Sequence, residues 1–140
     1  MKALTVRPFE GMAIMFGDKT VECRSKNISY RGDVVICTSA LKLKDTIPSH
    51  ALCIVEIVDC VPFTKDHLDA AMMQAVPDNH YAWVLDNVRI IAPIKIKGFL
   101  SLIDWGKVQK ANDEIIYLPE PQTDAEDEEQ YNKYYRDIII

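Results

Sequence analysis

The sequence has few glycines and prolines, the residues that interrupt helices and strands, and it has no long apolar run. Of its 140 residues, 5 are glycine and 7 are proline, which excludes collagen-like and low-complexity compositions. Its purely apolar runs, such as the three isoleucines at 138–140, are far shorter than the roughly 20 residues that cross a bilayer. Arg7 arrives before any apolar signal segment can form. We therefore expect one compact, soluble, cytoplasmic domain without a membrane partner.

The sequence lacks closely spaced cysteines, and the spacing of its 4 thiols does not favour metal binding. No CxxC pair occurs, and each thiol lies in an apolar stretch, at Cys23, Cys37, Cys53 and Cys60. These residues are typical of small buried side chains in a reducing compartment. His50, His67 and His80 do not add the close ligand pairs that zinc needs. We expect no metal and no cofactor, and we expect these histidines to hydrogen-bond loops or helix ends.

The net charge of -5 is unevenly distributed along the chain. Residues 1–118 carry 14 basic and 14 acidic side chains, whereas residues 119–140 carry 2 basic and 7 acidic ones. Within the neutral body, residues 1–44 hold 8 basic side chains against 4 acidic ones. A local positive field is therefore available to an anionic ligand, although the whole chain is acidic.

Apolar periodicity predicts two helices in the body, residues 1–118. Pro8 opens the first, whose apolar face repeats at helical spacing until Gly17 ends it. That face consists of Phe9, Met12, Ala13 and Phe16. Thr64 caps the second helix, which ends before Pro77. Its predicted apolar face consists of Leu68, Ala71, Met72 and Ala75.

Strand patterns fill the remainder of the body. They cover residues 20–25, 34–38, 51–61, 81–91 and 99–103, and residues 3–6 form a short apolar start before the first helix. After the first helix most strands follow one another directly, which argues against a doubly wound parallel sheet. The prediction is an α+β fold, a small barrel of about five to six mixed or antiparallel strands with two to three flanking helices.

The acidic segment 119–140 begins at two prolines, Pro119 and Pro121, that indicate a linker. Asp124 is a suitable cap for a final helix, with acidic residues in its first turns and basic ones in its last. An aromatic and aliphatic stripe follows at helical spacing: Tyr131, Tyr134, Tyr135 and Ile138. The stripe packs either on the body's own apolar surface or on a second copy of the chain, which would make a homo-oligomer.

Several short motifs resemble the ASCH domain, a family of the PUA-like superfamily of small β-barrels. The string GDKTVECR at 17–24 fits the family signature GxKxxExR, and YRG at 30–32 and ICTS at 36–39 follow it. EIVDC at 56–60 and the stretch from Trp83 through Pro93 to Gly98 continue the same order, so the resemblance covers about residues 3 to 105. It implies a PUA-like barrel with a cleft where Lys19, Glu22 and Arg24 converge, and it implies RNA or another nucleic acid as ligand.

Some members of the family that this chain resembles are enzymes. One branch deacetylates N4-acetylcytidine with a Lys, Thr and Glu set, and another cuts RNA. The Lys of the amidohydrolase set falls on Lys19, whereas its Thr falls on Glu22, which departs from that pattern.

The side-chain chemistry of the signature residues can also be interpreted without the family resemblance. Glu22 and Arg24 share one face of a strand, and the planar fork of Arg24 matches a phosphate or a base edge. The carboxylate of Glu22 beside that arginine would repel a phosphate but can accept hydrogen bonds from a base edge. This arrangement therefore favours recognition of a base. Partial desolvation of Lys19 would favour its neutral amine, which can act as a base or nucleophile. The alternative is a solvent-facing ion pair and an ordinary turn lysine.

Other candidates lie downstream. Tyr30 and Arg31 can form an aromatic platform beside a cation, or a rim tyrosine that its arginine covers. Thr38 and Ser39 end a buried strand, where their hydroxyls line the cleft or make a turn. Trp83 is expected in the core.

Three functional hypotheses follow. The first is a binding module that holds RNA or a modified nucleotide with Lys19, Glu22, Arg24 and Arg31. The second is a hydrolase of RNA or a modified nucleoside, with Lys19 as base or nucleophile and Glu22 or Glu56 as proton carrier. The third is an interaction protein that uses the tyrosine-bearing tail.

Overall fold

The computed structural model describes residues 1–111 and 113–140. Its strands are β1 (Lys2–Val6), β2 (Val21–Arg24), β3 (Gly32–Thr38), β4 (His50–Pro62), β5 (Tyr81–Lys95) and β6 (Leu102–Asp104). Its helices are α1 (Pro8–Met15), α2 (Leu68–Ala71) and α3 (Asp124–Gln130). They are accompanied by 3₁₀ turns at Lys65–His67 and Trp105–Lys107 and by a π-helical turn at Tyr131–Tyr135. Each of these helices falls short of the length and apolar character that a membrane-crossing segment requires.

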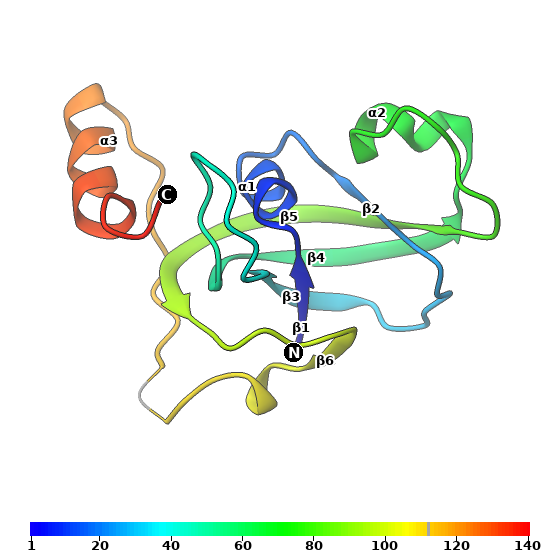
Figure 1. Cartoon of the computed structure of the whole chain (residues 1–140), viewed down its shortest axis with the longest axis horizontal. Coiled ribbons are helices and arrows are strands. Elements are labelled where there is room, and N and C mark those ends of the chain that lie inside the picture. Colours follow the sequence, from blue (N-terminus) through cyan, green and yellow to red (C-terminus); the bar gives the residue numbers. More distant parts are fainter. Residues whose placement is uncertain (112) are drawn as a thin grey trace.

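These strands form one mixed sheet in the order β2-β5-β4-β3-β1-β6. β1 runs parallel to β3, and every other neighbouring pair is antiparallel. The register between β4 and β5 shifts at several points, as β-bulges do, and both long strands bend. The sheet therefore curls into a half-barrel (Figure 1), which confirms the predicted α+β, PUA-like fold.

The half-barrel has a seam between β2, at one edge of the sheet, and β1, near the other. β6 pairs with β1 as far as Leu4, which leaves the backbone of Thr5 beyond the end of β6. Nη2 of Arg24 donates to the carbonyl oxygen of Thr5 at 2.8 Å. A side chain of β2 thus spans the seam where no β-ladder is described between the two strands.

The main core lies between α1 and one face of the sheet. It contains Leu4, Val6, Ile14, Val34, Ile36, Leu52, Val55, Ile57, Trp83 and Leu85, among others. α1 approaches the sheet closely at Gly11, where an added Cβ would lie 2.6 Å from Cγ2 of Thr38. Trp83 is 3% exposed, so the expectation that it belongs to the core is confirmed. α1 packs on the sheet through Ala13, Ile14 and Met15, whereas Phe9 and Phe16 of its predicted apolar face are exposed.

The second predicted helix is wrong in length. Thr64 does cap it, and its hydroxyl oxygen accepts a hydrogen bond from the backbone of Asp66. However, α2 ends at Ala71, because Met72 adopts a left-handed conformation with φ of 56°. Met72 and Ala75, predicted on a buried face, are exposed. The freed carbonyl oxygens at the end of α2 accept hydrogen bonds from the segment that leads into β2, so tertiary contacts replace further helical turns.

Two strands, β5 and β6, differ most from their predicted boundaries. β5 continues past residue 91 to Lys95 and includes Pro93, which lies where the register with β4 is irregular. A proline is tolerated there because a bulge does not require its missing N–H. The last strand is Leu102–Asp104 rather than 99–103, since it follows the short partner that β1 offers.

The tail folds back onto the body. Thr123, not the predicted Asp124, caps α3, because its side chain accepts the hydrogen bond from the backbone N–H of Glu126. Tyr135 and Ile138 pack against the main core, and burial raises the pKa of Tyr135 to about 12. Tyr131 remains 43% exposed. Two of the four stripe residues, Tyr135 and Ile138, therefore pack on the chain's own surface, and assembly through the tail stays a prediction.

Candidate functional site

The signature residues lie at the turn from α1 into β2. Gly17 has φ of 83° and ends α1 as predicted, because its backbone adopts a conformation that favours glycine. Lys19 follows in the turn, and Glu22 and Arg24 lie two residues apart on β2. Glu22 is opposite Trp83 in the ladder with β5. The strand period therefore brings Glu22 and Arg24 together, and the turn adds Lys19.

Lys19 is a buried cation, only 3% exposed. Its Nζ donates to the carbonyl oxygen of Ala71 at 2.7 Å and lies 3.6 Å from Oε1 of Glu22. The neighbouring backbone N–H of Thr20 donates to the carbonyl oxygen of Ala70 at 2.9 Å. Lys19 is thus no ordinary turn lysine, because it fastens the end of α2 to the start of β2.

Glu22 connects the two cations. Its Oε2 accepts hydrogen bonds from Nε and Nη2 of Arg24, at 3.1 and 3.0 Å. Its side chain is 9% exposed, whereas that of Arg24 is 30% exposed and lies 5.8 Å from the ring of Trp83. Among the described residues, Oε1 of Glu22 has Lys19 as its ion-pair partner but accepts no hydrogen bond. The pair is therefore buried on the carboxylate side and open on the arginine side.

A cleft of about 370 Å³ lies over this charged floor, within the size range of small-molecule sites. We call it the helical cleft, because α1 and the end of α2 contribute to its walls. Its lining consists of Phe9, Glu10, Lys19, Glu22, Cys23, Ala71, Met72, Met73, Pro77 and His80. Burial, with the charge of Glu22, raises the pKa of the Cys23 thiol, which favours its neutral form. The cleft combines apolar walls with an ion pair at its base.

A second cavity of about 490 Å³ lies along the seam, and we call it the seam slot. It is lined by Lys2, Arg24, Ser25, Lys26, Asn27, Ile28, Ser29, Tyr30, Trp83, Ser101 and Leu102. Arg24 belongs to this slot, whereas its partner Glu22 lines the helical cleft. The ion pair of Glu22 and Arg24 therefore connects two cavities.

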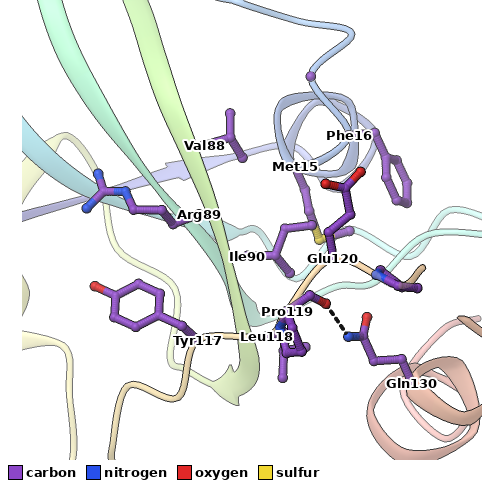
Figure 2. Close-up of a pocket in the computed structure, with 12 residues that line it drawn as sticks. Met15, Phe16, Val88, Arg89, Ile90, Tyr117, Leu118, Pro119, Glu120 and Gln130 are labelled. Atoms are coloured by element: carbon purple, nitrogen blue, oxygen red, sulfur yellow. Dashed lines mark hydrogen bonds between the residues drawn. The ribbon is translucent and has the colours of Figure 1, made fainter. Parts of the chain in front are cut away.

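A larger cavity, about 660 Å³, lies elsewhere and has mostly apolar walls. Figure 2 shows it between the end of α1, the middle of β5 and the segment that precedes α3. Its arginine, Arg89, is paired with Asp33 at 2.6 Å, and Gln130 donates to the carbonyl oxygen of Pro119. We call it the apolar groove, and it contains none of the predicted site residues.

The remaining predicted site residues are dispersed. Tyr30 lines the seam slot and donates its hydroxyl to the carbonyl oxygen of Asp33 at 2.7 Å. Arg31 is exposed and donates to carbonyl oxygens of its own loop. Thr38 is fully buried and exchanges hydrogen bonds with the backbone of His50. The hydroxyl of Ser39 is buried without a hydrogen-bond partner in the described part of the chain. Arg31, Thr38 and Ser39 line none of the cavities described above.

The histidines bond to loops and helix ends, as expected. Nδ1 of His50 and of His80 lie 2.7 Å from the carbonyl oxygens of Pro48 and Asp78, and Nδ1 of His67 accepts from the backbone of Thr64. Within residues 1–111 and 113–140, no three His, Cys, Asp or Glu side chains converge as metal ligands. Sequence reasoning missed the cleft walls at Met72 and Met73, because they depend on a turn that helical periodicity does not reveal.

The fold and this cleft define a PUA-like half-barrel that carries a buried Lys–Glu–Arg cluster beside its seam. A family model described as the ASCH domain matches residues 4–137. The chain belongs to the ASCH domain family, and the match reaches beyond the expected residues 3–105 into the tail.

Solved structures with this fold include ASCH from Zymomonas mobilis. It is 12% identical, with a TM-score of 0.55, over 94% of this chain and 93% of its own. A tyrosine-to-phenylalanine variant of ZmASCH is 17% identical over 67% of this chain and 74% of its own, with a TM-score of 0.54. A serine-to-alanine variant is 17% identical over 67% and 72%, with a TM-score of 0.53. No curated protein matches this chain. At these identities the structural likeness shows the fold alone.

Proposed function

We propose that this ASCH-domain protein binds RNA or a modified nucleotide, with a base in the helical cleft. The observation that carries the proposal is the position of Oε1 of Glu22. Glu22 lines the cleft, and its Oε1 lies 3.6 Å from Nζ of Lys19 but accepts no hydrogen bond among the described residues, while Oε2 is held by Arg24. A buried carboxylate oxygen usually has such partners, so an open one in a cavity is suited to a ligand's N–H group.

The polar groups of the cleft fit the edge of a base. A carboxylate accepts from an exocyclic amino group, and the neighbouring Lys19 ammonium donates to a ring nitrogen or carbonyl oxygen. Cytosine, adenine and guanine each present a donor beside an acceptor, and single-stranded RNA exposes these edges. Lys19 and Glu22 are held by Ala71 and Arg24, so binding needs little rearrangement of either side chain.

The walls of the cleft support the same class of ligand. Phe9 and Met72 are 57% and 47% exposed, although both are large apolar side chains. Aromatic and apolar surfaces of this kind pack against the faces of unstacked bases. The basic excess of residues 1–44 attracts the polyanion, while the acidic tail packs on the body through Tyr135 and Ile138.

A hydrolase in the same cleft is the second candidate, because Lys19 and Glu22 form an amine and carboxylate pair 3.6 Å apart in a cavity. Against it, the Lys19 Nζ is already hydrogen-bonded to Ala71. Glu56, the alternative proton carrier, lines none of the cavities described above and is opposite Asp33 in the sheet. The binding role therefore has stronger support.

The test is a calorimetric titration of the full chain with the four nucleosides, N4-acetylcytidine and the four homohexameric RNAs. Mass spectrometry of the same mixtures detects any product. We expect saturable binding with a preference among bases and no turnover. Glu22→Gln changes that preference, because a carboxylate has two acceptor oxygens, whereas the amide has one acceptor oxygen and one NH2 donor group. The matched control is Glu114→Gln, at an exposed position, which leaves the preference unchanged.

Two results separate the candidates. Product that disappears in Lys19→Ala but persists in Lys107→Ala would assign the hydrolase instead of the binding module. An identical preference profile in Glu22→Gln and wild type would remove Glu22 from base recognition and contradict the proposed function.

A further inference from the structure

The seam slot is not used by a base held in the helical cleft, although Arg24 connects the two. Its lining brings together three cations, Lys2, Arg24 and Lys26, with the hydroxyls of Ser25, Ser29 and Ser101. Among the described residues, the carboxylates that contact this lining are Asp104, which pairs with Lys2, and Glu22, which pairs with Arg24. A lining of cations and hydroxyls is a site for an oxyanion.

Two of the three cations have donors left for a ligand. Arg24 uses Nε and Nη2 for Glu22 and Thr5, so Nη1 has no acceptor among the described residues. Lys26 is exposed and has no ion-pair partner in the part of the chain that the structure describes. Lys2, by contrast, is bound to Asp104 at 2.7 Å, and it holds the pKa of that carboxyl below its ordinary value. The open charge of the slot is therefore at Arg24 and Lys26.

The loop that carries Lys26 is fixed in place. Nε1 of Trp83 donates to the carbonyl oxygen of Lys26 at 2.9 Å, and the Tyr30 hydroxyl anchors the other end of the loop on Asp33. The ring of Tyr30 lies 6.0 Å from Nζ of Lys2 and lines the slot. The backbone that carries Lys26 thus has a defined position before a ligand arrives, which lowers the entropic cost of binding.

We propose that the seam slot binds the phosphodiester adjacent to the base in the helical cleft, so that the ligand is a single-stranded nucleic acid rather than a free nucleoside. This inference rests on the proposed function. Glu22 and Arg24 are two residues apart on one strand, so their Cα atoms are about 7 Å apart. One ligand can therefore place a base edge on Glu22 and the adjoining phosphate on Nη1 of Arg24 and on Lys26. The slot binds phosphate through charge and hydrogen bonds, and contacts to phosphate carry no sequence information.

The test compares each nucleoside with its 5′- and 3′-monophosphates and with the matching hexamers of RNA and single-stranded DNA, by calorimetry on the full chain. We expect at least one phosphate position to tighten binding about tenfold, the effect of one charge-assisted hydrogen-bond set. Lys26→Ala removes most of this gain, while the backbone carbonyl that anchors Trp83 is retained. Its matched control, Lys42→Ala, is an exposed lysine outside the slot and keeps the gain.

Salt dependence supplies a second readout. The slope of log affinity against log salt for the hexamers falls by about 0.7 in Lys26→Ala, because one phosphate contact is lost. The loss is equal for RNA and DNA, since both carry the same phosphodiester. A loss confined to RNA would overturn the assignment.

The two proposals fail in different ways. If Glu22→Gln alters base preference but Lys26→Ala and Lys42→Ala retain the same phosphate gain, the slot assignment is wrong and the base site stands. If Lys26→Ala weakens the hexamers but Glu22→Gln leaves the preference unchanged, the slot stands and base recognition by Glu22 is wrong.

Discussion

Two charge clusters join strands of this sheet, and they differ in how many of their hydrogen-bonding atoms are used. Asp33 and Arg89 form a two-point pair at 2.6 and 3.0 Å, in which both carboxylate oxygens and both terminal nitrogens are used. Glu22 uses Oε2 for Arg24, whereas its Oε1, 3.6 Å from Nζ of Lys19, and Nη1 of Arg24 form no hydrogen bond among the described residues. Glu22 and Arg24 also line cavities. The closed pair fastens strands together, and the pair with unused hydrogen-bonding atoms is the one that we propose as a ligand site.

The clusters also differ in burial. The side chains of Lys19 and Glu22 are 3% and 9% exposed, whereas those of Arg89 and Asp33 are 26% and 41% exposed. Charges out of water are costly unless paired, while an exposed pair is screened. The cluster proposed to bind a ligand should therefore also be the more sensitive to loss of one partner.

The largest expected effect follows from that difference. Glu22→Ala leaves the Lys19 ammonium buried without its carboxylate, and it should lower the free energy of unfolding by about 3 kcal/mol. Asp33→Ala should lower it by at most about 1 kcal/mol, because its pair with Arg89 is partly exposed. Urea denaturation of both variants measures the two values. Equal losses would remove the distinction between the clusters.

A second variant separates stability from binding. Replacing Lys19 and Glu22 together by methionine removes both buried charges and keeps side chains of similar length. Such replacements of buried ion pairs are often neutral, although here the partly exposed Arg24 and the carbonyl oxygen of Ala71 lose a partner. The double variant should therefore lose less free energy of unfolding than Glu22→Ala. It should nevertheless lose binding of the RNA hexamers. A stable double variant that binds like wild type would show that the cluster is structural, as Asp33 and Arg89 are.

The smallest effect is a dependence of stability on pH. Burial lowers the pKa of His50 from its ordinary value of 6.5, so the unfolded chain binds this proton first and stability declines as pH falls below about 6.5. The hydrogen bond from Arg89 lowers the pKa of Asp33 from 3.8, so its contribution is lost below about pH 3.8. Thermal melts across this range should show both declines, and Asp33→Asn should reduce the lower one, to which Asp104 also contributes because Lys2 lowers its pKa. A lower decline of undiminished size in this variant would assign it to other carboxylates.

The sequence predicts the cluster of Lys19, Glu22 and Arg24 better than it predicts the cavities that these residues line. Strand periodicity places Glu22 and Arg24 on one face, and Gly17 places Lys19 at the turn, because both effects are local. The burial of Lys19 was not predictable, since it depends on the turn at Met72 that presents the carbonyl oxygen of Ala71. The division of the predicted set between two cavities also depends on tertiary structure, because the seam arises only when the sheet curls.

Thr38 shows the opposite outcome. Its place at a strand end, in a motif that resembles the family, suggested a hydroxyl in the cleft, but the side chain packs beneath α1 against Gly11. Its hydrogen bonds with His50 connect β3 to β4. A residue pattern on one strand cannot reveal which helix covers it, and the close approach at Gly11 decides the position of this side chain.

The central claim is that the ligand binds on the Glu22 and Arg24 cluster and not in the larger apolar groove. The most direct test is a titration of the isotopically labelled full chain with the four nucleoside 5′-monophosphates, followed by amide chemical-shift mapping. We expect the largest shifts at residues 19–30 and 71–73, around the helical cleft and the seam slot. Shifts concentrated at residues 88–90 and 117–121, around the apolar groove, or no shifts with any of the four, would contradict the account.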